Sequence, residues 1–288
     1  MSIRKTTAKT GKTRSAPREL PVTDIGEDDG EGLSFVLYGR SGTGKTTLAA
    51  DFEKPMLYID VKDKGTKSIR DVKGIKRLKV GAFADFEDAY WWLKDNPERY
   101  RTVVIDTVSQ LQALYVREFG EAKGKHSKRN VGDWGTLTKR DWGDIAAKMK
   151  EWLGNYRDLV ELGMDVVFIA QDRTFNIGDD DTEDEEVLAP EVGPGLSPSI
   201  AKALNASVDL IGNTFIRSQW IEEKNSKGKV VSEHEQIDFC LRVGPNSLYV
   251  TKVRKPKGQM APTLIVDPSF DDILDVINGE YKNGSQSK

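Results

Sequence analysis

The sequence predicts an α/β protein in which a mainly parallel β-sheet is flanked by helices and followed by an antiparallel β extension on the C-terminal side. Three features of the chain support this fold class. A glycine-rich loop joins a short apolar run to a helical segment, continuous apolar runs alternate with helical patterns as far as residue 171, and β-prone segments follow. Continuous apolar runs are typical of parallel strands that helices cover on both faces.

Composition narrows the class of protein. The chain has 288 residues, a formal net charge of −3 and a single cysteine, Cys240. This length allows one large domain or two ordinary ones, and the charge argues against a uniformly basic nucleic-acid coat protein. One cysteine cannot form an internal disulfide, and no apolar run is long enough for a membrane span or a signal peptide. We therefore expect a cytoplasmic protein with no membrane partner.

Three regions are expected along the chain. Residues 1–31 are rich in Lys, Arg, Thr and Ser and then in Asp and Glu, with few large apolar groups, which predicts a disordered tail. Residues 32–278 hold the alternating pattern and form the predicted folded domain. Residues 279–288 are polar and are predicted to be a flexible tail.

The first predicted elements are a strand at 34–38 and a helix at 47–52. Residues 39–46 read Gly-Arg-Ser-Gly-Thr-Gly-Lys-Thr, which is a complete phosphate-binding loop in the strand–loop–helix setting that the motif requires. The glycines let backbone N–H groups curl around phosphate oxygens, and the helix N-terminus adds partial positive charge. Lys45 is expected to reach the β- and γ-phosphates, and the Thr46 hydroxyl to coordinate Mg²⁺. The predicted residues of this nucleoside triphosphate site are Gly39, Arg40, Ser41, Gly42, Thr43, Gly44, Lys45, Thr46 and Thr47.

Further strands are predicted at 55–60, 101–107 and 164–171, with helical patterns at 81–93 and 138–162. Asp106 ends an apolar strand, which is typical of the carboxylate that holds Mg²⁺ in P-loop proteins. Its alternative role is to cap the next helix. Together with the loop, Asp106 and Thr46 are the predicted metal ligands.

The segments after residue 171 have a different character. A hairpin is predicted over 174–192 with an acidic tip at 179–186, and a short helix over 198–210. Strands are predicted at 213–222, 234–243 and 247–253, and a last helix at 271–277. These strands form the expected antiparallel extension.

Two of these strands carry a resemblance to a known family. Residues 103–111 (Val-Val-Ile-Asp-Thr-Val-Ser-Gln-Leu) resemble the metal-binding strand of RecA-type recombinases, and residues 167–173 (Val-Phe-Ile-Ala-Gln-Asp-Arg) resemble their next strand. The span from about 33 to 277 is similar to phage-encoded, core-only RecA-like ATPases that promote single-strand annealing. The resemblance implies a RecA-like P-loop ATPase domain over 32–278 that uses ATP and Mg²⁺ and is stimulated by DNA, and a place in the host cytoplasm.

The resemblance also implies roles for particular residues. Gln171 would sense the γ-phosphate, and Lys252 and Arg254 would act on the nucleotide of a neighbouring subunit. An added cation stabilises the charge that spreads over a transferring phosphoryl group, and strand alternation places Lys252 and Arg254 on one face. A solvated strand face is the alternative.

The expected catalytic glutamate is missing from its place after the second strand. Lys62 stands at that position. Asp60 or Asp63 could accept the proton of the attacking water instead, or hydrolysis is slow and nucleotide binding acts as an assembly switch.

A basic insert, residues 123–129, falls where RecA-like proteins have their first DNA-binding loop. Lysines would bind the phosphates of DNA without regard to sequence; a solvated loop is the alternative. The candidate DNA-binding residues are Lys123, Lys125, His126, Lys128 and Arg129. The expected partners are single-stranded DNA, further copies of the chain in a ring or filament with nucleotide at the subunit interfaces, and a single-stranded-DNA-binding protein. The alternative functions are an AAA+ or helicase-loader-like ATPase acting on a protein, a small-molecule kinase, and a non-hydrolysing nucleotide-gated scaffold.

Overall fold

The computed structural model describes residues 31–62, 65–125, 137–175, 190–224 and 230–282. Most of the two predicted tails lies outside these ranges, as do the acidic tip 179–186 and the greater part of the basic insert.

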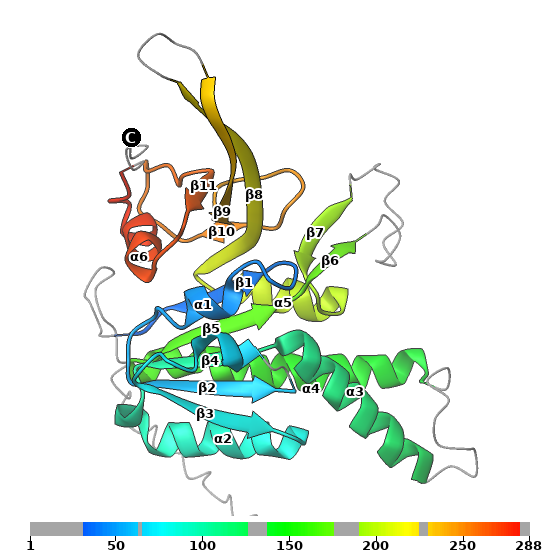
Figure 1. Ribbon diagram of the computed structural model, residues 1–288. Coiled ribbons are helices and arrows are strands. Elements are labelled where there is room, and N and C mark those ends of the chain that lie inside the picture. Colours follow the sequence, from blue (N-terminus) through cyan, green and yellow to red (C-terminus); the bar gives the residue numbers. More distant parts are fainter. Residues whose placement is uncertain (1–30, 63–64, 126–136, 176–189, 225–229, 283–288) are drawn as a thin grey trace, which may run out of the picture.

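A single large sheet carries the fold (Figure 1). Eight of its nine strands run in the order β11-β9-β8-β1-β5-β4-β2-β3, and the ninth, β10, pairs with β8 outside this path. The strands of the sheet are β1 (Ser34–Tyr38), β2 (Met56–Val61), β3 (Ile75–Val80), β4 (Thr102–Asp106), β5 (Asp165–Ala170), β8 (Leu210–Lys224), β9 (Val230–Arg242), β10 (Lys252–Val253) and β11 (Leu264–Val266). All pairings from β8 through β1 to β3 are parallel, and those among β8, β9, β10 and β11 are antiparallel. The predicted fold class, a mainly parallel sheet with an antiparallel extension, is confirmed.

Helices cover both faces of the sheet. They are α1 (Lys45–Ala49), α2 (Phe83–Asp95), α3 (Val108–Lys125), α4 (Lys139–Arg157), α5 (Pro198–Ser207) and α6 (Phe270–Asn278), with the 3-10 helices η1 (Gly65–Ile69), η2 (Pro97–Arg99) and η4 (Asp158–Leu162). A separate small pair joins β6 (Asp172–Phe175) to β7 (Glu191–Pro194) in antiparallel register.

The alternation of side chains along β1 explains why the core has two halves. Val36 and Tyr38 belong to a buried cluster that includes residues of α2, α3, α4 and α5. Phe35 and Leu37 belong to a second buried cluster that includes residues of α1 and α6. Successive strand residues point to opposite faces of a sheet, so a central strand with helices on both sides must be apolar at every position.

Several element boundaries differ from the sequence prediction. The helix predicted over 138–162 is α4 followed by the separate η4, which ends at Gly163 with φ 80°. The strand predicted over 247–253 is only the two-residue β10, because the backbone N–H groups of Leu248 and Tyr249 donate to the Asn246 side chain and turn the chain there.

Two strands were not predicted, the edge strand β3 and the three-residue β11 at the other edge of the sheet. β3 is an edge strand in which Lys76, Arg77 and Lys79 are exposed, so it has no continuous apolar run. Pairing with β2 from Met56↔Ile75 to Val61↔Val80 makes it a strand despite this composition. Tertiary pairing therefore decided what the local pattern did not indicate.

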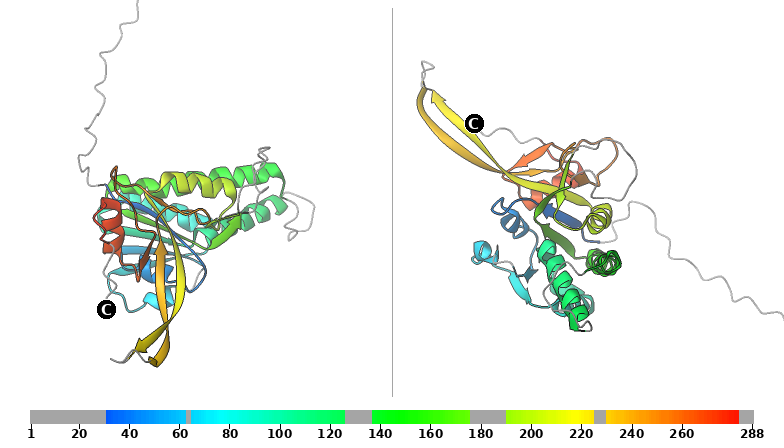
Figure 2. Two further views of the ribbon diagram at one scale, coloured as in Figure 1. Left: turned by 90° about the horizontal axis from the view of Figure 1, so that it is seen from above. Right: turned by 90° about the vertical axis from the view of Figure 1, so that its right-hand side faces the viewer.

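The long strands β8 and β9 leave the body of the molecule as a twisted hairpin (Figures 1 and 2). Their pairing continues from Asn213↔Arg242 to Lys224↔Val230, with an irregularity near Glu223. Within the described ranges, the helices lack the combination of length and hydropathy that crossing a membrane would require.

Candidate nucleotide-binding site

The glycine-rich loop connects β1 to α1 at the carboxyl end of the parallel strands. Gly44 has φ 86° and forms the N-cap of α1, a conformation that residues with a Cβ adopt at a cost. Gly39 is pressed against the extension, since a Cβ there would lie 2.3 Å from the carbonyl oxygen of Thr214. The two positions explain why this loop needs glycine at both ends.

Lys45 lies over the loop rather than extending into solvent. Its ammonium donates to the carbonyl oxygens of Gly39 at 2.7 Å and Arg40 at 2.6 Å, and the residue is only 8% exposed. A buried ammonium needs such partners. The charge is therefore held beside the N–H groups of the loop, where a phosphate would meet both.

Three residues from separate strands and a helix meet behind the loop. The Thr46 hydroxyl donates to Asp106 Oδ2 at 3.1 Å, and the hydroxyl of Tyr58 donates to the same oxygen. Asp106 is 2% exposed and Tyr58 is fully buried. Burial, and next the charge of Asp106, raise the pKa of the Tyr58 phenol well above its usual range. Tyr58 therefore remains a hydrogen-bond donor to the carboxylate.

The donor set beside the loop suits a magnesium ion. Mg²⁺ is bound in proteins by one or two carboxylates together with substrate phosphates, and the Thr46 hydroxyl and the Asp106 carboxylate are adjacent oxygens. Gly65 of η1 closes the site from another side, because a Cβ there would lie 3.1 Å from Thr46 Oγ1 and 3.3 Å from Asp106 Oδ2. The residues present fit the metal that the loop motif implies.

Asp60 lies on the strand next to Asp106. The two aspartates are register partners in β2 and β4, and Asp60 is 6% exposed. Arg77 Nη1 lies 3.8 Å from Asp60 Oδ2, and the Thr66 hydroxyl lies 3.5 Å from it. Lys62 is exposed and has φ 55°, whereas Asp63 lies outside the described residues. Of the two candidate carboxylates, Asp60 is the one that the structure describes, and it is the register partner of Asp106. Its role as the group that activates water stays a prediction.

Gln171 follows β5 at the same edge of the sheet. Because Ala170 pairs with Tyr38, Gln171 lies level with the first residue of the loop. Its backbone N–H donates to the Ser109 hydroxyl at 3.2 Å, and its carbonyl accepts from Gly195 N at 2.6 Å. The backbone of Gln171 is fixed while the residue is exposed. The position suits the predicted sensor, and that role stays a prediction.

The antiparallel extension supports the loop, which the sequence did not predict. The hydroxyls of Thr43 and Thr214 are 2.6 Å apart, and the ring of Phe239 lies 3.3 Å from where a Cβ on Gly44 would sit. These contacts join loop residues to β8 and β9. No local signal marks Tyr58, Thr214 or Phe239 as site residues; only the strand register brings them to the loop.

Lys252 and Arg254 lie at the other end of β1. Lys252 Nζ donates to the carbonyl oxygens of Asn205 and Ala206, and Arg254 donates to Asp209 at 3.0 Å and to Ala206 O at 3.2 Å. Burial, and then the charge of Arg254, lower the pKa of Lys252.

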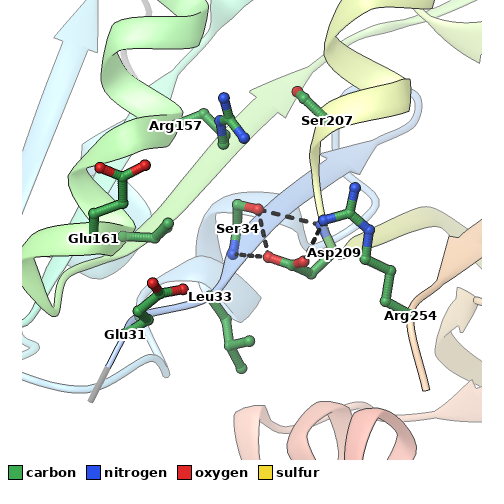
Figure 3. A pocket seen from close by; sticks show the side chains of 10 residues that line it. Glu31, Leu33, Ser34, Arg157, Glu161, Ser207, Asp209 and Arg254 are labelled. Atoms are coloured by element: carbon green, nitrogen blue, oxygen red, sulfur yellow. Dashed lines mark hydrogen bonds and ion pairs between the residues drawn. The ribbon is translucent and has the colours of Figure 1, made fainter. Parts of the chain in front are cut away.

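Asp209 links these cations to the start of β1, since it accepts from Ser34 N at 2.9 Å. Arg254 and Asp209 border a pocket of about 350 Å³ with Arg157 and Glu161 on its far side (Figure 3). Ser34 begins β1 and Tyr38 ends it next to the loop, so the two ends of the strand are about 13 Å apart. The structure brings Lys252 and Arg254 together, but it separates them from the loop of the same chain.

Little of the predicted DNA-binding insert is described. Lys123 donates to Asp141, which also caps the start of α4 by accepting from Thr138 N at 2.6 Å. The hydrogen bond from Lys123, and then those from Thr138, lower the pKa of Asp141 to about 2. Lys125 ends α3, and His126, Lys128 and Arg129 lie outside the described residues. Lys123 is therefore engaged within the chain.

The sequence matches a protein family described as AAA domain over residues 31–254. No curated protein matches the chain. Among solved structures, a KaiC-like protein from the hyperthermophilic archaeon Pyrococcus horikoshii OT3 is similar with 14% sequence identity, a TM-score of 0.40, and coverage of 83% of this chain and 91% of that chain.

Proposed function

The chain belongs to the AAA-domain family and is a P-loop ATPase, and from this premise we propose that it uses ATP with Mg²⁺ to bind single-stranded DNA and to promote annealing or recombination. One observation carries the nucleotide part of the proposal. Lys45 at the start of α1 folds back over the phosphate-binding loop, and the adjacent Thr46 donates to Asp106 at the end of β4, 60 residues further along the chain. This is the arrangement that holds a triphosphate for phosphoryl transfer.

Each residue has a distinct part in the proposed chemistry. The loop N–H groups and the Lys45 ammonium bind the β- and γ-phosphates and offset their charge. Thr46 and Asp106 would hold Mg²⁺, which when bound neutralises charge on the same phosphates. Tyr58 keeps the Asp106 carboxylate in place by donating to it. The loop thus supplies positioning and electrostatic stabilisation.

Activation of the attacking water is assigned to Asp60. Its carboxylate is buried and lies one strand from Asp106, and Gln171 would contact the γ-phosphate from the neighbouring strand β5. The exposed Lys62 stands where a glutamate is expected, so a non-hydrolysing nucleotide-gated scaffold is the second candidate. Comparing ATP turnover with ATP affinity separates the two.

Assembly of several copies is supported by the place of Lys252 and Arg254. These cations bond within the chain to Ala206 O and lie at the opposite end of β1 from the loop, so any nucleotide that they contact would be that of a neighbouring subunit. A head-to-tail contact of this kind generates a ring or a filament. The sequence resemblance is the basis for four other parts of the proposal: the binding of DNA, the phage origin, the place in the host cytoplasm and the single-stranded-DNA-binding protein as a partner.

An AAA+ or helicase-loader-like ATPase that acts on a protein is the other class of function. That class needs a helical lid after the core, whereas residues 210–224 and 230–242 form the strands β8 and β9. The observed extension therefore favours the first proposal.

ATP hydrolysis with and without single-stranded DNA tests the proposal. Wild type is expected to hydrolyse ATP faster with DNA, and Lys45→Ala to lose nucleotide binding and turnover. Lys54→Ala is the matched control, because Lys54 lies outside the loop and donates only to Asp51 O within the described contacts. ATP turnover that DNA does not change, together with no DNA binding, would refute the DNA part and leave the ATPase.

A further inference from the structure

The hairpin of β8 and β9 has an exposed apolar side. We use the name arm for residues 215–224 and 230–240, and arm stripe for Ile216, Trp220, Ile237 and Phe239, exposed apolar side chains on one face of it. Ile216 pairs with Phe239, and Ser218 pairs with Ile237. Trp220 is two positions after Ser218 on β8, so the alternation of side chains places it on the same face as Ile216, Ile237 and Phe239. The exposed fractions of the stripe are Ile216 45%, Trp220 71%, Ile237 57% and Phe239 43%.

The opposite face of the arm is polar and internally paired. Arg217 donates to Asp238 Oδ2 at 3.0 Å and 2.6 Å, and Gln219 and Gln236 also donate to Asp238. The hydrogen bond from Arg217 lowers the pKa of Asp238. One face of the arm is thus satisfied within the chain, while the other presents large apolar groups to its surroundings.

An exposed apolar stripe on a projecting hairpin needs a partner. Such edges and patches otherwise promote non-specific association. The arm projects from the body of the molecule (Figure 2), and its inner end, at Phe239, lies against Gly44 of the phosphate-binding loop. The outer part of the arm carries exposed carboxylates, Glu222, Glu223, Glu233 and Glu235. The partner must therefore combine apolar groups with positive charge.

A surface of that kind occurs at the other end of the sheet. We call it the basic strip: residues 67–79, which hold six cations and a single carboxylate, Asp71, in a chain of net charge −3. Val72 within it is 40% exposed, and β3 is the terminal strand of the sheet. The cations of the basic strip are Lys67, Arg70, Lys73, Lys76, Arg77 and Lys79, all of them exposed.

We propose that the arm of one copy of this chain docks on the basic strip of a second copy. The arm stripe would meet the exposed Val72, and the carboxylates of the arm would meet the lysines of the strip. Because the two surfaces differ and lie at opposite ends of one sheet, the contact is heterologous and propagates into a ring or filament. Charge complementarity selects a second copy over a nucleic acid for the arm, whose carboxylates repel phosphate.

This inference deepens the self-assembly part of the proposed function and rests on it. It assigns the surfaces that assemble the copies, and it places one end of the contact beside the nucleotide loop through Phe239. Nucleotide bound in the loop would then adjoin the docked neighbour, which links assembly to the nucleotide state.

Sedimentation velocity of the full chain, with a non-hydrolysable ATP analogue and Mg²⁺, tests the apolar part. Trp220→Ala/Ile237→Ala is expected to raise the protein concentration needed for assembly by about tenfold or more, as truncation of buried interface anchors does. Trp142→Ala is the matched control, because Trp142 is 43% exposed but lies on α4. Equal assembly of the double variant and wild type overturns the proposal, as does a wild type that stays monomeric.

A charge exchange tests the pairing of the two surfaces. Glu233→Lys/Glu235→Lys and Lys73→Glu/Lys76→Glu are each expected to weaken assembly by about tenfold, and the chain with all four changes is expected to assemble again. Failure of the combined variant to recover overturns the proposed pairing. Loss of single-stranded DNA binding in Lys73→Glu/Lys76→Glu with unchanged assembly also overturns it, and would identify the strip as a nucleic-acid surface.

Binding of a fluorescent ATP analogue to each variant separates this inference from the proposed function. All of the substituted residues lie outside the phosphate-binding loop, residues 39–46, so nucleotide affinity of the monomer is expected to be unchanged. If the variants bind nucleotide normally, keep DNA-stimulated turnover and assemble like wild type, only the proposed docking surfaces are refuted. Absence of nucleotide binding in wild type refutes the proposed function itself.

Discussion

Replacing Tyr58 with phenylalanine removes one hydroxyl from behind the phosphate-binding loop and leaves the ring. The hydroxyl donates to Asp106 Oδ2, and the surroundings are dry, with Tyr58 fully buried and Asp106 2% exposed. A hydrogen bond to a charged group contributes about 1.5–3 kcal/mol. For a chain of this size, that loss corresponds to a fall of roughly 3–12 °C in the thermal midpoint.

Differential scanning calorimetry of the nucleotide-free protein measures this fall. Tyr156→Phe is the matched control, because its hydroxyl is also buried but donates to a neutral acceptor, Phe86 O, at 2.8 Å. A neutral hydrogen bond contributes about 0.5–1.5 kcal/mol, so the control is expected to lose less stability.

Addition of ATP and Mg²⁺ gives the second reading of the same variant. A ligand that binds only the folded state raises its stability, and a cation at Asp106 would compensate for the lost donor. The rise in midpoint is therefore expected to be larger for Tyr58→Phe than for Tyr156→Phe. Equal losses in the two variants, followed by equal rises, would refute the idea that Tyr58 stabilises the Asp106 charge.

Three further predictions concern the start of α4, the core and the loop. The folded-state pKa of Asp141 is lowered from 3.8 to about 2, so the Asp141 carboxylate stabilises the fold above pH 3.8 and this stabilisation is lost as the pH falls through about 2. Asp141→Asn is expected to remove this acid-dependent loss from the unfolding curves. Asp144 is exposed on the same helix, and its control variant Asp144→Asn is expected to retain the loss. Phe52 is fully buried, with its ring centroid 4.9 Å from that of Phe35 and 4.3 Å from that of Phe270, so Phe52→Ala is expected to cost about 3–5 kcal/mol in urea unfolding; a loss below 1 kcal/mol would contradict this packing. Gly39→Ala would bring a Cβ to 2.3 Å from Thr214 O and is expected to abolish binding of a fluorescent ATP analogue, whereas Gly143→Ala, where a Cβ meets nothing within 4 Å, is expected to bind normally.

Local patterns were sufficient for the buried parallel strands β1, β2, β4 and β5. β1, β2, β4 and β5 each lie within a few residues of an apolar run recognised in the sequence, because a strand covered on both faces must be apolar throughout. β3 escaped the prediction for the opposite reason: an edge strand can carry lysines on its exposed face and still pair with β2.

The site divides in the same way. Residues 39–46 were recognisable because the phosphate-binding motif is contiguous and its chemistry depends on backbone conformation. Tyr58, the second partner of Asp106 beside Thr46, was not recognisable, since it meets the carboxylate only through the register of β2 and β4. Thr214 and Phe239 reach the loop from a hairpin almost 200 residues away in the chain, a separation that leaves no local signal.

The sequence by itself thus determined the loop, its lysine and threonine, and the α/β class, because each depends on neighbours within a few positions. Only the tertiary structure decided that Tyr58 holds Asp106, that the extension supports the loop, and that Lys252 and Arg254 lie at the far end of β1. Those relations depend on strand order and register, which are set by the packing of the whole sheet and the two halves of its core.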